Sequence, residues 1–282
     1  MPVPEELESR YYASQGFDPD HARHVRSQYL PFVAGKQLLL ELGCGRGEFL
    51  QLAAPEVGRV LGVDLDPEMV KQAADAGVEA VQADVIEFVG STTERPDAVF
   101  LAHLIEHLSV DEAFQMLEQI ARIVPTGGVV IIVTPNPACL ANLTNDFWSD
   151  PTHVRLYTVD LLRFLLDQTG FDLLEAGGNP LDVPGPPPEL LSVEAPEPWG
   201  DAEVEVAPMA PIRYDESFQL DTVLDELHRL RAAVEGLAHW IGEHDGRLAE
   251  LRHLAETTAA RHDEALRHLY GPNEIYAVGV RR

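Results

Sequence analysis

Two short stretches carry side chains whose types suit acid–base or metal chemistry. Residues 103–107 read His-Leu-Ile-Glu-His, and residues 150–155 read Asp-Pro-Thr-His-Val-Arg. His107 or His153 could act as a general base, because the pKa of a free imidazole lies close to neutral pH. Alternatively, Glu106 and the two histidines could hold a divalent metal, since imidazole nitrogens and carboxylate oxygens are common metal ligands.

The His-x-x-Glu-His pattern at 103–107 also matches a zinc-peptidase motif in its letters. That motif requires a long helix that carries both histidines, whereas the apolar run 97–102 directly before it predicts a strand. The sequence therefore disfavours a peptidase and leaves the general base and the metal site open.

A glycine-rich turn at residues 43–47 is the second candidate site. An apolar segment of strand length, 38–42, precedes the turn, and a segment with helical periodicity follows it. Glycines at alternate positions permit positive φ and a close approach to a ligand, while the N-terminus of the following helix offers free N–H groups. A small polar ligand is therefore expected at this turn.

The spacing of the turn argues against a dinucleotide. Glu48 stands where the G-x-G-x-x-G motif requires Gly or Ala, and its carboxylate would repel a phosphate. Asp64 ends a second apolar strand at 61–64, about 20 residues after the turn, where a carboxylate can hold ribose hydroxyls. The expected ligand contains a ribose and has no pyrophosphate at the turn.

Here the chain resembles the class I S-adenosylmethionine-dependent methyltransferases. Their first motif, E-x-G-x-G-x-G, is present at residues 41–47, their second strand ends in an acidic residue, and residues 82–85 are similar to their adenine-contacting motif. The resemblance implies that S-adenosylmethionine is the cofactor. The residues that it places at the cofactor are Glu41, Gly43, Gly45, Gly47, Asp64, Leu65, Asp84, Val85 and Ala102.

The stretch 147–158 resembles a D-P-T-H-x-R segment of methyltransferases that act in glycan assembly, including the methyltransferase part of bacterial O-antigen chain-terminating enzymes. The resemblance implies that His153 and Arg155 line the acceptor pocket. It also implies that Trp148 and Tyr157 stack on a sugar ring. The acceptor expected from this stretch is a small molecule or an oligosaccharide.

The Glu106-His107 pair is similar to two further methyltransferase groups, the metal-dependent small-RNA terminal 2′-O-methyltransferases and the quinone-biosynthesis O-methyltransferases. This similarity implies that both side chains face the transferable methyl group. It also implies a candidate site for Mg²⁺ or another divalent metal at Glu106, His107 and His153. The RNA group carries Glu where this chain has His103, so an identical metal shell is not expected.

The elements that must position these residues follow a strand–helix alternation. Strands are predicted at 37–42, 59–64, 78–82, 97–102 and 127–134, with helices near 47–54, 67–76, 84–89 and 110–123. This alternation predicts an α/β fold with a doubly wound, mostly parallel sheet, whose carboxyl edge brings the motifs together. In the family that it resembles, the sheet has seven strands and the last strand is antiparallel, which suits 171–176 and 274–280.

The chain is expected to contain four segments. Residues 1–35 form a helical segment that could cover the site, and residues 36–180 with 271–282 form the methyltransferase domain. Residues 181–217 are a linker rich in proline and acidic side chains. Residues 218–270 carry an unbroken heptad-like pattern, which predicts a coiled coil or a helical hairpin inserted before the last strand and points to a homo-oligomer.

Composition restricts the partners and the location. The formal net charge is −27, with 47 acidic and 20 basic side chains, which disfavours nucleic acids because their binding depends on Lys and Arg. The N-terminal residues lack the pattern of a signal peptide, and no apolar run is long enough to cross a membrane. A cytoplasmic protein without membrane insertion is therefore expected.

The sequence predicts an S-adenosylmethionine-dependent O-methyltransferase that acts on a hydroxyl of a sugar or glycan-type substrate. In-line methyl transfer requires alignment of the acceptor oxygen and removal of its proton, and His107, His153 and Glu106 are the candidates for this work. A quinone-like phenol and an RNA 3′ end are the alternative acceptors. A non-catalytic scaffold that keeps the fold and assembles through its helices is the alternative from another class.

Overall fold

The computed structural model describes residues 18–143, 147–183, 220–241 and 248–282. The chain divides into two compact units, one made of residues 1–184 and 272–282 and the other of residues 185–271. Most of the predicted linker at 181–217 lies outside the described residues. Within the described residues, no helix combines the length and the apolar character needed to cross a membrane.

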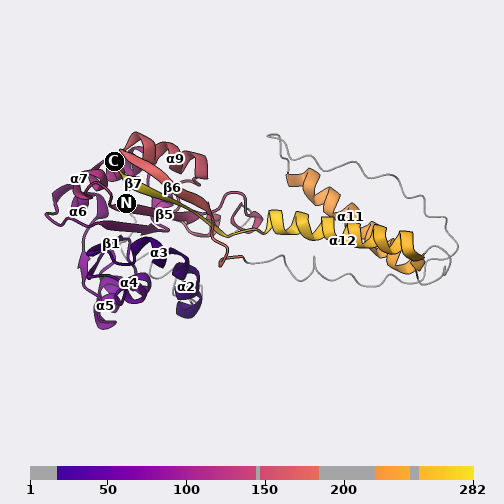
Figure 1. Ribbon diagram of the computed structural model, residues 1–282, viewed down its shortest axis with the longest axis horizontal. Helices are drawn as coiled ribbons and strands as arrows, with labels where there is room; N and C mark the ends of the chain where they lie inside the picture. The colour runs from indigo at the N-terminus through magenta and orange to yellow at the C-terminus, as the bar shows by residue number, and fades with distance from the viewer. Residues whose placement is uncertain (1–17, 144–146, 184–219, 242–247) are drawn as a thin grey trace. The chain divides into compact units, whose positions relative to one another are not determined.

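A seven-stranded sheet forms the centre of the first unit (Figure 1). Its strands are β1 (Leu38–Leu42), β2 (Arg59–Asp64), β3 (Ala80–Gln82), β4 (Ala98–Ala102), β5 (Val129–Pro135), β6 (Phe171–Gly178) and β7 (Glu274–Arg281). The strand order is β3-β2-β1-β4-β5-β7-β6, with β1 to β5 parallel and β7 antiparallel to both β5 and β6. The predicted fold class is confirmed, including the discontinuous last strand.

Helices cover both faces of this sheet, as Figure 1 shows. They are α2 (Pro19–Arg26), η1 (Ser27–Tyr29), α3 (Leu30–Val33), α4 (Glu48–Ala53), α5 (Pro67–Asp75), α6 (Val85–Ser91), η2 (Ile105–His107), α7 (Val110–Ile123), α8 (Phe147–Ser149) and α9 (Val159–Gln168). One apolar core joins α6, α7 and α9 to the sheet, and a second joins η1, α3, α4 and α5 to it. The predicted N-terminal helix is divided into α2, η1 and α3.

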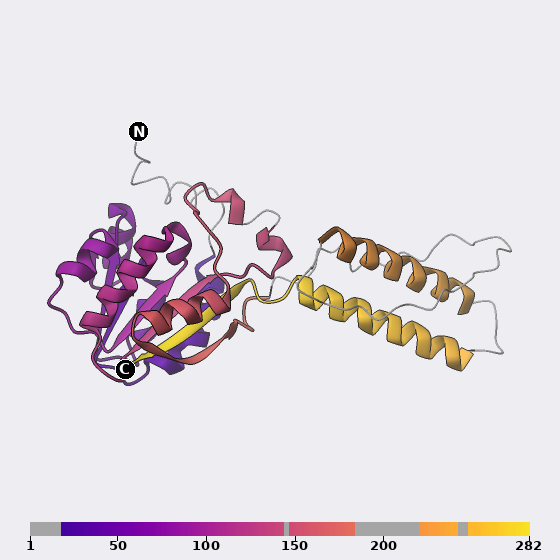
Figure 2. The same ribbon diagram turned by 90° about the horizontal axis from the view of Figure 1, so that it is seen from above.

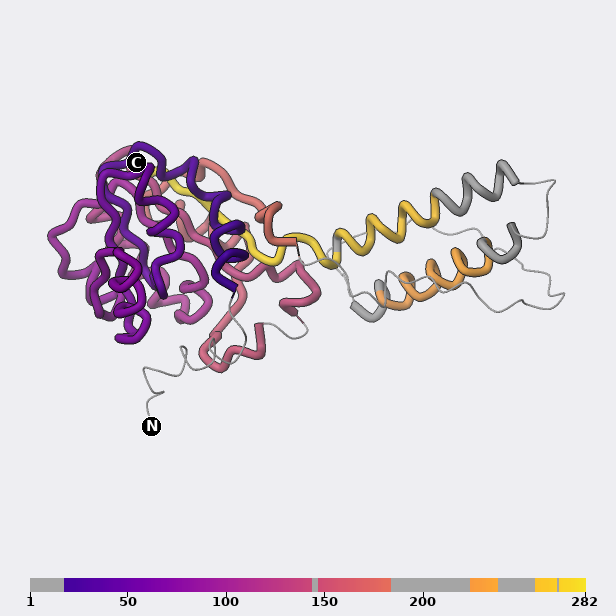
Figure 3. Tube along the Cα trace, turned by 90° about the horizontal axis from the view of Figure 1, so that it is seen from below, coloured from indigo at the N-terminus to yellow at the C-terminus, as the bar shows by residue number. Residues whose placement is uncertain are grey.

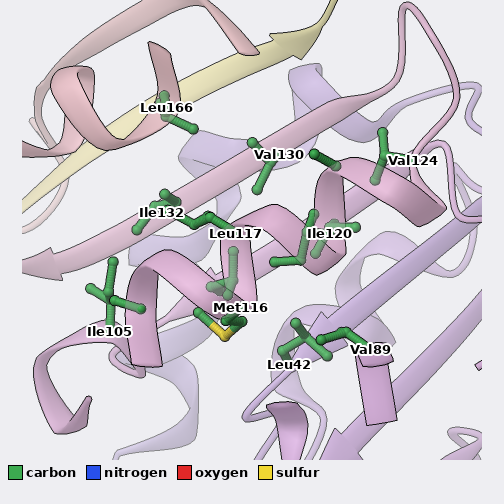
Figure 4. Packing of buried hydrophobic residues seen from close by; sticks show 14 of the residues in the cluster. Leu42, Val89, Ile105, Met116, Leu117, Ile120, Val124, Val130, Ile132 and Leu166 are labelled. Carbon is green, nitrogen blue, oxygen red and sulfur yellow. The ribbon is translucent and has the colours of Figure 1, made fainter. Parts of the chain in front are cut away.

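The central strands of this sheet are apolar along their whole length because helices pack on both faces of the sheet. Every residue of β1, β4 and β5 is buried, as expected for strands with helices on both faces. Side chains that alternate along β5 therefore enter different cores. On one side, Leu117 and Ile120 of α7 pack with Val130 and Ile132 of β5 (Figure 4).

The second unit contains two described helices, α11 (Leu220–Ile241) and α12 (Leu248–Leu269), which pack against each other. Figure 2 shows the two helices side by side, and Figure 3 draws the described part of each as a coiled tube. The described part of the predicted helical segment thus forms two helices, and residues 242–247 lie outside the described chain. Oligomerisation through this segment stays a prediction.

Candidate active site

A cavity of about 750 Å³ opens at the carboxyl edge of the parallel strands. The loop after β1, the end of β2, the start of α6 and the end of β4 all contribute to its wall. In open parallel sheets, ligands bind at this edge, where neighbouring connections diverge to opposite faces. The sequence motifs that were expected to converge do so around one space.

The glycine turn forms the floor of this cavity. Gly43, Gly45 and Gly47 have φ values of 70°, 52° and 77°, so all three use the left-handed region that favours glycine. Gly43 and Gly45 line the cavity, whereas Gly47 is the N-cap of α4, where an added Cβ would lie 3.3 Å from Val78 and 3.4 Å from Ala73. Gly45 thus leaves open space at the turn, and Gly47 permits close packing at the start of the helix.

Asp64 ties the end of β2 to the glycine turn. Its Oδ2 accepts a hydrogen bond from the Gly45 N–H at 2.7 Å, and its Oδ1 accepts one from the Asp66 N–H at 2.9 Å. Burial raises the pKa of this carboxyl group, although the two backbone donors oppose that shift. The carboxylate is held at the cavity wall, where ribose hydroxyls were predicted to bind.

The other predicted cofactor residues occupy two kinds of position. Leu65, Asp84, Val85 and Ala102 line the cavity, and Asp84 also caps α6 by accepting hydrogen bonds from the first turn of that helix. Glu41 does not line the cavity, because its side chain is buried on β1 beneath the turn. Burial raises the pKa of Glu41 to about 8.

His107 also lines the cavity. Its Nδ1 lies 2.9 Å from the Thr152 hydroxyl, and its Nε2 is buried without a hydrogen-bond partner among the described residues. Burial lowers the pKa of His107, and the nearby charge of Glu106 opposes this effect. The side chain is therefore a neutral imidazole at pH 7 with an unused nitrogen.

Glu106 and His153 lie beside His107 and do not line the cavity. Glu106 is fully buried, and its Oε2 accepts a hydrogen bond from the Thr134 hydroxyl at 2.9 Å. The rings of His107 and His153 are 4.7 Å apart, and His153 Nδ1 donates to the Phe147 carbonyl oxygen at 2.6 Å. One donor atom from each of the three predicted residues lies within 4.8 Å of the others.

His103 has a different environment from the other two histidines. Its Nδ1 lies 3.3 Å from Glu106 Oε1, and its Nε2 lies 3.0 Å from Glu274 Oε2. Burial lowers the pKa of His103, but the hydrogen bonds and charges of the two carboxylates have the larger effect and raise it to about 10. A charged imidazolium has no lone pair, so His103 is excluded as a general base at neutral pH.

The three residues predicted to bind the acceptor do not line the cavity. Tyr157 is fully buried in the apolar core, so it cannot offer a face to a sugar in this arrangement. The Arg155 guanidinium lies 5.0 Å from the centre of that ring. Trp148 is 66% exposed, and its indole N–H donates to the Leu143 carbonyl oxygen.

Several cavity residues were not predicted from the sequence. His21 and Arg26 come from α2, and Asp182, Asn273 and Glu274 flank the inserted segment on its two sides. The only available sequence signal was the predicted cover formed by the N-terminal helical segment. The start of β7 gave no signal, because a single Glu at the beginning of an apolar strand is ordinary.

Comparisons with known proteins agree with this architecture. A family model described as a methyltransferase domain matches residues 15–176. Arsenite methyltransferase of Halobacterium salinarum is 30% identical over 157 residues, which cover 51% of this chain and 39% of that protein. Ubiquinone biosynthesis O-methyltransferase of Xanthomonas oryzae pv. oryzae is 32% identical over 148 residues, which cover 48% and 61%. The chain spans less than two thirds of the length of either relative.

A solved structure extends the comparison to the whole chain. The SAM dependent methyltransferase from Archaeoglobus fulgidus has a TM-score of 0.64 at 22% identity, and the match covers 98% of this chain and 100% of that one. The sheet topology and the glycine-lined cavity define a class I S-adenosylmethionine-dependent methyltransferase fold. Because the family model matches more than half of the sequence, the chain belongs to the methyltransferase-domain family.

Proposed function

We propose that this chain is an S-adenosylmethionine-dependent O-methyltransferase that acts on a hydroxyl of a small, uncharged, glycan-type acceptor. The observation that carries the proposal is a single cavity that the glycine turn, Asp64 and the His107 side chain all line. When bound, S-adenosylmethionine supplies an activated methyl group on a sulfonium. The protein's own work is then to position the acceptor oxygen and to take up its proton.

His107 is the residue proposed to take up that proton. Its Nε2 belongs to a neutral imidazole, lacks a hydrogen-bond partner among the described residues, and belongs to a side chain that lines the cavity. His103 is held as a cation by two carboxylates, and His153 lies behind the cavity wall. Among the three candidate histidines, His107 alone combines a neutral ring with a side chain that lines the cavity.

The carboxyl groups in the part of the cavity next to Glu274 favour an uncharged acceptor. Asp182 and Glu274 contribute carboxyl groups to the wall beside His103, which contacts both Glu274 and Glu106. The arginines that line the cavity, Arg26 and Arg46, come from α2 and from the glycine turn. A phosphate or carboxylate on an acceptor next to Glu274 would meet unfavourable electrostatics, as would the backbone of an RNA. A sugar hydroxyl or a neutral phenol meets no such penalty.

A divalent metal is the second way in which the same residues could activate a hydroxyl. Glu106, His107 and His153 fit such an ion, because their donor atoms are close together and their other polar atoms already have hydrogen-bond partners. Two imidazoles and one carboxylate suit zinc, iron or nickel better than Mg²⁺, which prefers oxygen ligands. A metal held there would lower the pKa of the acceptor hydroxyl.

The proposal is tested by binding and turnover measurements on the full chain. Calorimetry should detect S-adenosylmethionine binding, and absence of binding would favour a non-catalytic scaffold. A screen of sugar, phenol and RNA acceptors should then give methylated sugar. With the acceptor found, His107→Gln should reduce kcat by about 100-fold or more and leave cofactor affinity within about twofold.

The control for this variant is His228→Gln, on the exposed surface of α11. Unchanged turnover in His107→Gln would refute the assignment of the base. The same assay after chelation separates the two routes: loss of activity that zinc or iron restores supports the metal, and full activity supports the unassisted base.

A further inference from the structure

The two arginines of the cavity wall come from the side that α2 and the glycine turn form. Arg26 is the last residue of α2, and Arg46 lies within the turn. Carboxyl groups line much of the remaining wall, at Glu48, Asp64, Asp66, Asp84, Asp182 and Glu274. Among the described residues of the wall there is no lysine. An anionic group of a bound ligand is therefore expected on the side of the arginines.

A contact with Glu48 places the Arg26 guanidinium beside the glycine turn. Its Nη1 donates to Oε2 of Glu48 at 3.4 Å, and Glu48 is the first residue of α4, directly after Gly47. A guanidinium carries five N–H donors in a planar fork, and this contact occupies only one of its nitrogens. Arg26 can therefore pair with a carboxylate of a ligand while it keeps its contact with Glu48.

The backbone on both sides of Arg26 is held by buried partners. Val25 is buried, and its carbonyl oxygen accepts a hydrogen bond from the Asn179 side-chain amide at 3.0 Å. Tyr29 is fully buried, and its hydroxyl donates to Glu274 Oε1 at 2.5 Å. The Arg26 side chain itself is only 20% exposed. A guanidinium on a fixed helix end loses little freedom when a ligand binds, which favours affinity.

The proposed cofactor has one anionic group that needs such a partner. S-adenosylmethionine joins its ribose, expected at Asp64, to a methionine part that ends in an ammonium and a carboxylate. Asp64 contacts the glycine turn through the Gly45 N–H, and Arg26 reaches the same turn from α2. The other cation of the wall, His103, already contacts two carboxylates. The carboxylate of the ligand is therefore expected at Arg26.

We propose that Arg26 binds the carboxylate of the methionine part of S-adenosylmethionine. The proposal rests on the cofactor named in the proposed function and deepens it, because the three glycines and Asp64 contribute no cationic side chain to the cofactor site. Arg26 then determines specificity, since it selects a ligand with this carboxylate over an otherwise identical ligand without it. The N-terminal helical segment thus supplies a binding residue in addition to covering the cavity.

The test compares two ligands that differ only in this carboxylate. Calorimetry on the full chain measures Kd for S-adenosylmethionine and for decarboxylated S-adenosylmethionine, so no acceptor and no turnover are needed. The variants are Arg26→Gln, Arg46→Gln and, as the matched control, Arg163→Gln on the exposed surface of α9. The ratio of the two Kd values within one protein removes effects that a substitution has on both ligands alike.

We expect the wild type to bind S-adenosylmethionine about 10- to 100-fold more tightly than its decarboxylated form, because hydrogen bonds between charged groups are strong. Arg26→Gln should lose this preference by weakening the binding of S-adenosylmethionine, and it should bind the decarboxylated form within about threefold of the wild type. Arg163→Gln should match the wild type for both ligands.

Three results would overturn the role of Arg26. These are equal affinity of the wild type for both ligands, a preference that survives in Arg26→Gln, and a preference that is lost in Arg46→Gln alone. The first of these comparisons does not require any variant to fold. A wild type that binds neither ligand would instead refute the cofactor of the proposed function, so the two failures are distinguishable.

Discussion

Removal of the Glu274 carboxylate should destabilise the methyltransferase unit more than any exposed acidic substitution. Glu274 Oε1 accepts hydrogen bonds from the Tyr29 hydroxyl at 2.5 Å and from the Asn179 side-chain amide at 2.6 Å. Its Oε2 lies 3.0 Å from His103 Nε2. Glu274→Ala would leave two fully buried donors without this partner and the His103 cation with one carboxylate instead of two.

The expected loss is about 3 kcal/mol of unfolding free energy. Removing one member of a buried charged network typically costs about 3–5 kcal/mol. The lower end of this energy range applies to Glu274→Ala for two reasons. The His103 side chain is 37% exposed, so water screens its share, and Asn179 keeps a second acceptor in the Val25 carbonyl oxygen.

Glu274→Gln separates the two halves of this network. The remaining carbonyl oxygen can still accept from Tyr29 and Asn179, so only the interaction with His103 is lost, and we expect a cost of about 1 kcal/mol. Urea denaturation followed by circular dichroism measures both variants, and Glu118→Ala on the exposed surface of α7 is the control. A loss below about 1 kcal/mol for Glu274→Ala would refute the reasoning, as would equal losses for the two variants.

Two further predictions concern the floor of the cofactor site. Gly62→Ala should cost about 1–3 kcal/mol in thermal unfolding, because an added Cβ would lie 2.6 Å from Cys44 Sγ, whereas Gly90→Ala meets no neighbouring atom and should be neutral or stabilising. The pKa of Glu41 is raised from 4.5 to about 8, so folding favours its protonated form, and its contribution to stability is lost as the pH rises through that range. Glu41→Gln should therefore gain stability relative to the wild type between pH 5 and 9, by up to about 4 kcal/mol in urea denaturation, and parallel curves for the two proteins would contradict this.

The sheet could be predicted because its signals are local. β1, β4 and β5 are short apolar runs buried on both faces, and each is followed by polar or glycine-rich residues. The cofactor half of the cavity is equally local, since the turn at 43–47 and Asp64 end neighbouring strands. The prediction of β7 as an antiparallel strand depended on the resemblance to a family, because about 95 residues separate β7 from β6 in the sequence.

The other half of the cavity, proposed to bind the acceptor, could be predicted only in part. Its residues come together through tertiary contacts between segments far apart in the sequence. His103 has two carboxylate partners, and one of them, Glu274, lies 171 positions away in the sequence. Periodicity and motif spacing cannot report such a pair. Tyr157 was mispredicted for a different reason. An aromatic residue in a polar segment resembles a ligand contact, but Tyr157 is buried in a core that also contains residues of α7 and α9.

The position of β7 in the sheet has a consequence for synthesis of the chain on the ribosome. Among the described strands, β6 pairs only with β7, and β5 uses one of its two edges for the same strand. About 95 residues must be translated between β6 and β7, which takes about 5 to 20 seconds at typical elongation rates. During that interval the nascent domain exposes the unpaired edge of β5, a fully apolar strand, so chaperone capture should be strongest on ribosome-bound chains that end before residue 274.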